Sequence, residues 1–325
     1  MRALSLKERA NLLKTFVSGG RFLKQTPHWH PERMRDWQFQ RIQKLVATAM
    51  EEIPFYKAHY QAAGFEAGDL KTWEDFHGLP VVTKDDVIGN FPDRMLKSGT
   101  DLDDLIVSRS SGSSGKVLDI CYDSQAMITY TLAGLRLYRM GFSYGPFDRQ
   151  LYIYTSPYPF PSVFGLFPMH FVSTLEEVEK IADKVEAVRP ELLVCYPSHL
   201  KQIAPLLSKR AVSRLKCVSV NSEMSTQAER DAISEMLGCP VLDEYSSEEL
   251  TRIAAQCTCG NYHLFEDINY METFAPEEGT GLGVLVGTNL HNVAMPMIRY
   301  VQNDLGEIVE GGCGCGWKFR QLKNL

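Results

Sequence analysis

Residues 174–196 read TLEEVEKIADKVEAVRPELLVCY, and this stretch decides the fold. Thr174 with Glu177 three residues later resembles a capping box, which satisfies free backbone N–H groups at a helix start. Apolar side chains then recur at helical spacing and predict one buried helix face. They are Leu175, Val178, Ile181, Ala182, Val185 and Val188. Pro190 ends the predicted helix, and the apolar run 192–196 predicts a short buried strand.

The alternation of strand and helix continues on both sides of this stretch. Further strands are predicted at 151–155, 216–220 and 241–245, and further helices at 199–207 and 226–237. The last helix begins with a second capping box, Thr226 with Glu229, and ends before Gly238. Strands joined through helices run parallel. The sequence therefore predicts an α/β fold built on parallel βαβ units.

Polar residues follow three of the predicted strands. They are Tyr196-Pro-Ser198, Asn221-Ser-Glu223 and Tyr245-Ser-Ser-Glu-Glu249. Open parallel sheets bind ligands beyond the carboxyl ends of their strands. Each cluster alone is compatible with ordinary turn chemistry, but three at equivalent places predict an active site there.

A change in residue composition and apolar periodicity divides the chain into two predicted regions. Residues 38–53 carry a helical apolar stripe that Pro54 ends, and Thr83 with Asp86 resembles another helix start. From residue 257 onward the chain is rich in glycine and β-prone segments, which favours antiparallel strands. We therefore expect an α/β core over 1–255 and a β-rich subdomain over 256–325.

Composition and charge narrow the function classes. The chain has 325 residues and a net charge of −6, which argues against nucleic acid as the main ligand. No apolar run approaches the length of a membrane span, and we expect a cytoplasmic protein. Residues 1–45 hold ten Lys or Arg against three Asp or Glu, a balance of +7 that leaves −13 for the rest. This basic arm suits an acidic partner, or equally a solvated contact with its own acidic body.

The segment Ser108–Lys116 reads SRSSGSSGK and has the three parts of a phosphate-binding loop. Glycines let backbone N–H groups approach a phosphate, hydroxyls donate hydrogen bonds, and a lysine adds charge. It is not a Walker loop, because Ser110 and Val117 stand where that motif needs Gly and Ser or Thr. A flexible linker has the same composition. The residues alone leave both interpretations open.

With its neighbouring motifs, this segment resembles the adenylate-forming enzymes, in particular the phenylacetate–CoA ligase group. Ser110–Lys116 is similar to that family's Ser/Thr-Ser-Gly-Thr-Thr-Gly-Lys signature. The other matching motifs follow in the family's order over nearly the whole chain. They are Ile53-Pro-Phe-Tyr-Lys57, Leu79-Pro-Val-Val-Thr-Lys-Asp-Asp86, the three strand-end clusters, His263-Leu-Phe-Glu-Asp267, Met295-Pro-Met-Ile-Arg-Tyr300 and Asn303-Asp-Leu305.

The resemblance implies ATP-dependent formation of an acyl-AMP, with release of pyrophosphate. The implied phosphate contacts are Ser110, Ser111, Gly112, Ser113, Ser114, Gly115 and Lys116. The implied adenine and nearby contacts are Ser222, Glu223, Tyr245 and Ser246. Glu249 is expected to hold Mg²⁺, and Asp304 to accept hydrogen bonds from the ribose hydroxyls. Arg299 is expected to support the ribose-binding part of the site. Lys116, Glu249 and Arg299 are the expected catalytic residues.

The sequence departs from the family pattern in three places. Ser246 and Glu248 replace the glycine and the hydroxyl residue of the Tyr-Gly-x-Thr-Glu element, and a second carboxylate there repels phosphates unless a cation compensates. Gln302-Asn-Asp304 keeps only the aspartate of Thr-Gly-Asp. The chain reaches Leu325 about where the family's hinge begins, so the small C-terminal lid domain is expected to be absent.

Four of the eight cysteines form two close pairs, Cys257/Cys259 and Cys313/Cys315. In a reducing compartment, paired cysteines indicate a metal more often than disulfides. Four thiolates, or three with His263, satisfy the tetrahedral preference of Zn²⁺. The resembled group also has cysteines in these neighbourhoods, and some members bind zinc there. We expect a structural zinc; free reduced thiols and a redox role are the alternatives.

These expectations leave the acid and the acyl acceptor open. The acceptor is a thiol or an amine, as in CoA, a carrier protein or a small amine, and a homodimer is a further expectation. The alternatives are an adenylyltransferase that places AMP on a small acceptor, and a nucleotide-binding subunit without catalysis. Aromatic side chains around 152–167 suit either an acyl pocket or ordinary core packing.

Overall fold

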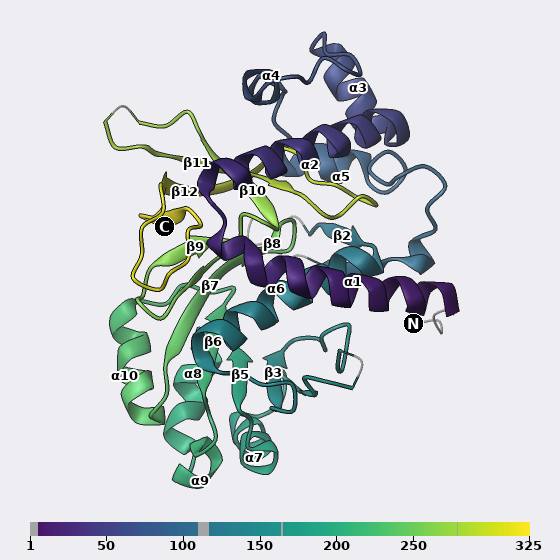
Figure 1. Ribbon diagram of the computed structural model, residues 1–325. Helices are drawn as coiled ribbons and strands as arrows, with labels where there is room; N and C mark the ends of the chain where they lie inside the picture. The colour runs from purple at the N-terminus through teal and green to yellow at the C-terminus, as the bar shows by residue number, and fades with distance from the viewer. Residues whose placement is uncertain (1–5, 110–116, 164, 278) are drawn as a thin grey trace. The chain divides into compact units, whose positions relative to one another are not determined.

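The computed structural model describes residues 6–109, 117–163, 165–277 and 279–325 (Figure 1). The predicted phosphate contacts Ser110–Lys116 thus lie outside the described residues. Contacts divide the chain into two compact units. The first comprises Met1–Ala133, Ser247–Ala254 and Tyr262–Leu325, and the second comprises Gly134–Ser246 and Ala255–Asn261. The boundary expected at 255/256 from the change in residue composition stays a prediction.

The second unit contains the predicted parallel sheet. Its strands are β3 (Gln150–Tyr154), β4 (Met169–Ser173), β5 (Leu192–Cys195), β6 (Cys217–Asn221) and β7 (Val241–Ser247). They pair in parallel in the order β7-β6-β5-β3-β4. The α/β fold class predicted from residues 151–245 is confirmed.

Short helices connect these strands and complete the core of the second unit (Figure 1). They are α7 (Val178–Val188), α8 (Pro197–Ile203), η3 (Ala204–Leu206), α9 (Lys209–Val212) and α10 (Gln227–Leu237). One apolar cluster joins the sheet to α7, α8 and α10, including Ile153, Val185, Leu193, Ile203, Val220 and Leu237. The apolar positions of α7, α8 and α10 in this cluster thus face the sheet, as their helical spacing requires.

The capping box at Thr226 and the helix start at Thr83 are confirmed, and the capping box predicted at Thr174 is wrong. The hydroxyls of Thr226 and Thr83 accept from the backbone N–H three residues on, at the starts of α10 and α5. By contrast, α7 begins at Val178 with Glu177 as its N-cap. Thr174 instead continues from β4, where its N–H donates to the Tyr154 carbonyl at 3.0 Å. Leu175 therefore lies outside the helix and is 85% exposed.

The first unit contains the β-rich region expected near the end of the chain. Its strands are β8 (Thr251–Gln256), β9 (Tyr262–Leu264), β10 (Asn269–Phe274), β11 (Leu282–Asn289), β12 (Tyr300–Val309) and β13 (Gln321–Lys323). Neighbours in the order β10-β11-β12-β13-β9 pair antiparallel. A separate antiparallel hairpin consists of β1 (Ile106–Arg109) and β2 (Asp119–Tyr122). The prediction of antiparallel strands after residue 257 is confirmed.

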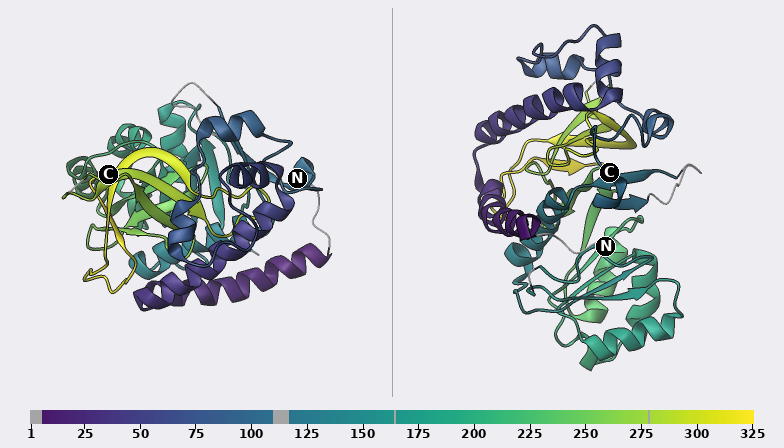
Figure 2. Two further views of the ribbon diagram at one scale, coloured as in Figure 1. Left: turned by 90° about the horizontal axis from the view of Figure 1, so that it is seen from above. Right: turned by 90° about the vertical axis from the view of Figure 1, so that its right-hand side faces the viewer.

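The helices of the first unit come from the first half of the chain. They are α1 (Leu6–Gln25), η1 (Thr26–His28), α2 (Pro31–Glu52), α3 (Pro54–Ala62), α4 (Trp73–Gly78), α5 (Lys84–Asn90), η2 (Leu102–Asp104) and, as far as Ala133, α6 (Ser124–Phe142). Figures 1 and 2 show α2 lying along β10, β11 and β12. Two side chains fix it there: Gln38 Nε2 donates to the Glu266 carbonyl at 2.6 Å and Arg41 Nη2 to the Leu290 carbonyl at 2.7 Å. Among the described residues, no helix has the length and apolar character needed to cross a membrane.

Candidate active site and metal centre

In the second unit, the carboxyl ends of β3, β5 and β6 bring their polar residues together. Tyr154 ends β3, and its hydroxyl donates to Asn221 Oδ1 at the end of β6. The same oxygen accepts from the Ser222 hydroxyl at 2.9 Å. The Tyr196 ring, just after β5, lies 4.5 Å from the Tyr154 ring between centroids. Two of the three predicted strand-end clusters therefore share one edge of the sheet.

Ser222 and Glu223 have a constrained geometry at this edge. Ser222 has a φ of 66°, in the left-handed region that a residue with a Cβ rarely occupies. Such strain is found preferentially where a side chain or carbonyl must face a ligand. Glu223 Oε2 accepts from the Ser198 N–H at 3.0 Å, which links the clusters after β5 and β6. Tyr245 and Ser246 lie half-buried on β7, the neighbour of β6.

In the first unit, two adjacent carboxylates occupy the turn between β7 and β8. Glu249 Oε1 accepts from the Tyr300 hydroxyl at 2.9 Å. Burial and the neighbouring Glu249 charge raise the pKa of Tyr300 far above its usual value, so this phenol remains a donor at neutral pH. The Glu248 carboxylate accepts from the Ser108 hydroxyl, and the Glu248 carbonyl accepts from the Tyr122 hydroxyl.

The β1–β2 hairpin is closed at the end nearest the predicted phosphate loop. Arg109 lies opposite Asp119 in the ladder and forms a bidentate ion pair with it, Nε to Oδ1 at 2.7 Å and Nη2 to Oδ2 at 2.9 Å. Hydrogen bonding from Arg109 lowers the pKa of Asp119, which keeps the carboxylate charged. Residues 109 and 119 therefore fix the described ends of the chain on either side of residues 110–116.

Arg299, predicted to be catalytic, is buried in the first unit with a φ of 52°. Its Nε donates to Glu272 Oε1 at 2.8 Å, and Nη1 donates to the carbonyls of His77 and Leu79. It lines a pocket of about 390 Å³ together with His77, Tyr270, Glu272 and Arg320, among others. These contacts support a structural role for the Arg299 guanidinium.

Asp304, the predicted ribose contact, lies exposed on β12, four residues beyond Tyr300. Asn303 beside it has a φ of 62°.

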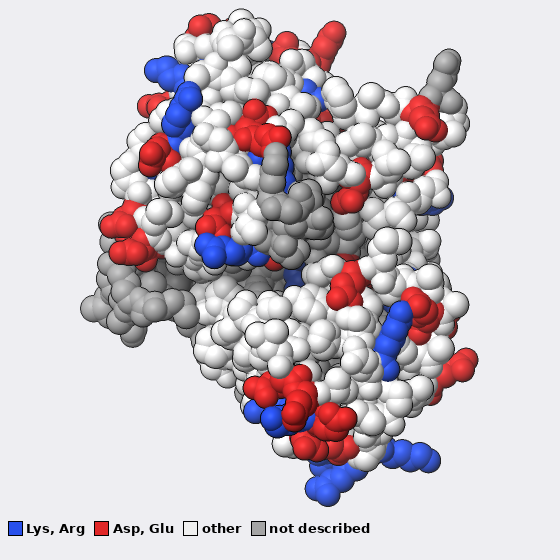
Figure 3. All heavy atoms as spheres, turned by 180° about the vertical axis from the view of Figure 1, so that it is seen from behind, with Lys and Arg blue, Asp and Glu red and all other residues white. Residues whose placement is uncertain are grey.

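On the face drawn in Figure 3, acidic and basic side chains of the described residues are interspersed rather than separated by sign.

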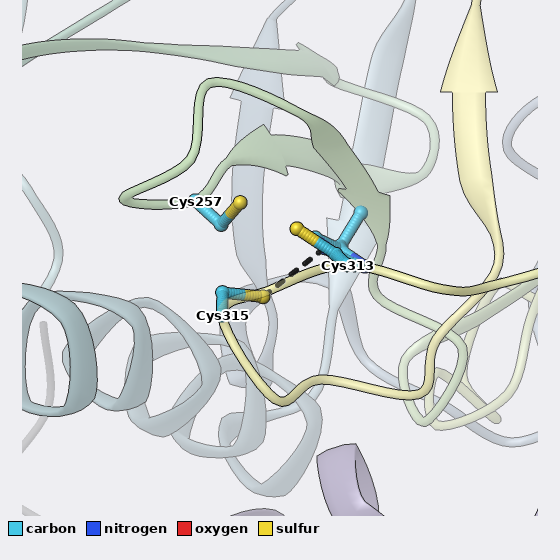
Figure 4. A group of neighbouring side chains, drawn as sticks. Cys257, Cys313 and Cys315 are labelled. Atoms are coloured by element: carbon cyan, nitrogen blue, oxygen red, sulfur yellow. Dashed lines mark hydrogen bonds between the residues drawn. The ribbon is translucent and has the colours of Figure 1, made fainter.

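Three of the predicted metal residues gather in the first unit. One His263 ring nitrogen, Cys313 Sγ and Cys315 Sγ lie within 4.8 Å of one another (Figure 4). His263 Nε2 lies 3.3 Å from Cys315 Sγ. The other two predicted ligands, Cys257 and Cys259, belong to the second unit, where Cys257 is buried and Cys259 is exposed.

Backbone groups around the cluster match a metal-binding arrangement. His263 is fully buried, and its Nδ1 lies 3.1 Å from the Phe319 carbonyl. A proton on Nδ1 leaves Nε2 as the ligand atom, the usual way a second hydrogen bond fixes the histidine tautomer. The N–H groups of Cys259 and Trp317 point at Cys257 Sγ and Cys315 Sγ, both at 3.4 Å. Such donors stabilise thiolates.

Comparison with known proteins gives relatives over most of the chain. The phenylacetate–coenzyme A ligase of Thermus thermophilus is 27% identical over 311 residues, 88% of this chain and 68% of the relative. The enzyme of the same name from Escherichia coli is 25% identical over 306 residues, 86% and 68% of the two chains. No protein-family profile matches. The chain is a relative of the phenylacetate–CoA ligases in the adenylate-forming superfamily.

Solved structures of 2-hydroxyisobutyryl-CoA ligase share the fold of this chain. An open conformation in complex with 2-HIB-AMP and CoA has a TM-score of 0.74 and 22% identity, and covers 87% of this chain and 72% of that one. The postadenylation state in complex with R3-HIB-AMP has a TM-score of 0.77 and 20% identity, and covers 91% and 68%. The α/β fold class expected from the sequence is therefore confirmed by the structure and by its neighbours.

Relationship to the phenylacetate–CoA ligases leaves the individual roles as predictions. Within each unit, the structure brings together Asn221, Ser222 and Glu223, and places Glu249 against Tyr300. Sequence reasoning missed Tyr300 and Ser108 as partners of the two glutamates. Tyr300 adjoins the predicted Arg299 and ends a recognised motif, which is the only signal the sequence offered. Ser108 and Glu248 are 140 residues apart, so no local pattern pointed to their contact.

Proposed function

We propose that this chain uses ATP to activate a carboxylic acid as acyl-AMP and transfers the acyl group to the thiol of CoA. The substrate carboxylate attacks the α-phosphorus of ATP, and the bond to pyrophosphate breaks. The CoA sulfur then attacks the acyl carbon, AMP leaves, and the thiol proton is released. Similarity to phenylacetate–CoA ligases over 86–88% of the chain supports this assignment.

The observation that carries the proposal is the Glu249 carboxylate held by Tyr300 at the turn that follows β7. A fixed carboxylate oxygen is a suitable ligand for Mg²⁺, which in turn neutralises phosphate charge during the attack. We assign Glu249 this role, Asp304 the ribose hydroxyls, Tyr245 the adenine, and the Ser110–Lys116 segment the phosphates.

Pyrophosphate release and hydroxylamine trapping test the proposal. Purified chain is incubated with ATP, Mg²⁺ and a panel of aryl and aliphatic acids, with and without CoA. We expect hydroxamate and acyl-CoA to form with at least one acid, and Glu249→Gln to lose most of this turnover. Pyrophosphate that requires a non-carboxylate acceptor would instead indicate an adenylyltransferase. Binding of an acyl-AMP analogue without turnover would indicate a binding subunit, and either result contradicts the proposal.

We also propose that Cys257, His263, Cys313 and Cys315 bind a structural zinc ion. Three thiolates and one imidazole are a standard ligand set for tetrahedral Zn²⁺. The separations below 4.8 Å among His263, Cys313 and Cys315 and the Phe319 carbonyl behind His263 support this assignment. The four protein donors leave no open position, so the ion supplies stability rather than Lewis-acid chemistry. Elemental analysis after dialysis is the direct measurement.

A further inference from the structure

One residue connects both strands of the β1–β2 hairpin to the turn that carries Glu249. The Glu248 side chain accepts from Ser108 on β1, and the Glu248 carbonyl accepts from Tyr122 on β2. Burial raises the pKa of Tyr122 well above its usual value, so its hydroxyl remains a donor. All of these residues belong to the first unit. The hairpin therefore has two hydrogen bonds to a single residue of another segment.

The next residue along the chain is the proposed magnesium ligand. Glu249 follows Glu248 directly, and its Oε1 accepts from Tyr300 at 2.9 Å. Adjacent residues share a planar peptide bond, so a shift of Glu248 is transmitted to the Glu249 backbone. Ser108, on the other side of the contact, precedes the proposed phosphate contact Ser110 by two residues. The Ser108–Glu248 bond thus links the entry to the phosphate segment with the carboxylate assigned to Mg²⁺.

We infer that Glu248 is a positioning residue that fixes the β1–β2 hairpin relative to Glu249. The inference rests on the proposed function. The resembled family places a hydroxyl residue at the position of Glu248, where a second carboxylate beside phosphates is unfavourable. Here the carboxylate is directed to a serine hydroxyl on the hairpin and serves as the acceptor of a structural hydrogen bond. Preorganisation of this kind improves affinity by reducing the ordering that a ligand must cause.

A double-mutant cycle on Mg-ATP binding tests the inference. The variants are Ser108→Ala, Glu248→Ala and the double variant, with Kd for Mg-ATP measured by calorimetry. Each single variant should weaken binding roughly fivefold, since each removes the same hydrogen bond. The double variant should also be roughly fivefold weaker, because the second change removes nothing further.

Two controls separate positioning from general damage. Glu248→Gln keeps an oxygen acceptor for Ser108, so its Kd should stay within about twofold of the unmodified chain. The Ser208–Glu186 pair on the second unit is chemically matched, with the serine hydroxyl donating to the carboxylate at 2.9 Å. The same cycle there should leave the Kd for Mg-ATP unchanged.

The outcomes are distinguishable from failure of the proposed function. If the unmodified chain binds no Mg-ATP, the proposed function is wrong, and the positioning role of Glu248, which depends on it, is wrong as well. If the unmodified chain binds Mg-ATP but the two single effects multiply in the double variant, Glu248 and Ser108 act independently and only this inference is overturned. Single variants without effect, or Glu248→Gln as weak as Glu248→Ala, overturn it as well.

Discussion

At the residue scale, His263 shows how one side chain organises the proposed metal group. Its ring is fully buried between Cys315 Sγ and the Phe319 carbonyl, and the Trp317 ring lies 5.8 Å away between centroids. A buried imidazole with a carbonyl beside one nitrogen and a cysteine sulfur beside the other has a single tautomer suited to a cation. Cys259, by contrast, is exposed.

Cysteine variants test which side chains bind the metal. Cys315→Ser should lose bound zinc during dialysis against a chelator that leaves the unmodified chain loaded, because it removes one of four ligands. Cys259→Ser should retain the same zinc content as the unmodified chain. Inductively coupled plasma mass spectrometry gives both values. Equal loss from the two variants would show that Cys259 also binds the metal.

The phenol of Tyr300 offers a second test at this scale. Tyr300→Phe removes one hydrogen bond to the Glu249 carboxylate and little else, so the Mg²⁺ concentration for half-maximal activity should rise about tenfold, as expected for a hydrogen bond to a charged group. Tyr144→Phe is the matched control, because its hydroxyl donates to the Asp148 carbonyl at 3.1 Å in the second unit. A similar Mg²⁺ requirement in both variants would contradict the role of Tyr300.

At the element scale, the start of α10 gives a pH-dependent contribution to stability. Hydrogen bonds from Lys201 and the Thr226 N–H lower the pKa of Glu229 from its ordinary value of 4.5 to about 2. A carboxylate with a lowered folded-state pKa stabilises the fold above pH 4.5, and this contribution is lost as the pH falls toward 2. Glu229→Gln should therefore flatten the fall in unfolding free energy between pH 5 and 3, relative to the unmodified chain, in urea titrations.

Strand packing in the first unit gives an element-scale prediction about Gly287 on β11. A Cβ at this position would lie 2.8 Å from Met271 Sδ and would collide with the Leu250 side chain. Gly287→Ala should destabilise the protein by about 1–3 kcal/mol through overpacking, measured by urea unfolding. Gly20→Ala on α1 is the control, since nothing lies within 4 Å of its added Cβ and alanine favours a helix. Equal stability of both variants would refute the predicted collision.

Sequence patterns predicted elements well where their signals are local. The helix starts at Thr83 and Thr226 rest on residues three apart, and both formed as predicted. Strand β4 was missed because its five residues are all half-buried and show no alternation. Thr174 was misassigned because its hydrogen bond goes to Tyr154 on another strand, and a sequence window does not see that partner.

The candidate site shows the same division between local and distant information. The cysteine pairs and His263 were predicted as metal residues because ligand chemistry restricts the residue types. The grouping of His263 with Cys313 and Cys315 depends on two distant segments meeting, which no local pattern reveals. The contacts of Glu248 and Glu249 join residues 140 and 51 positions apart, and only the folded chain reveals them.

At the scale of the whole molecule, all four tryptophans report on one unit. Trp29, Trp37, Trp73 and Trp317 belong to the first unit, which also holds His263, Cys313 and Cys315. Removal of zinc by a chelator should therefore lower the midpoint of thermal unfolding seen by tryptophan fluorescence. Re-addition of Zn²⁺ should restore it, whereas Mg²⁺ should not. An unchanged midpoint in a chain shown to lose its metal would contradict a structural role for the ion.

The loop that carries Cys313 and Cys315 also contacts the beginning of the chain. The Lys318 N–H donates to the Pro27 carbonyl at 2.7 Å, and His28 Nδ1 lies 3.2 Å from the Gly316 carbonyl. On a ribosome, residues 27 and 28 emerge long before residues 316 and 318 are made. The segment 134–246, by contrast, holds all five strands of its sheet within one continuous stretch except for the last residue of β7. Synthesis from the amino end therefore lets the parallel sheet form first. The N-terminal segment can make its contacts with Gly316 and Lys318 only when synthesis of the chain is nearly complete.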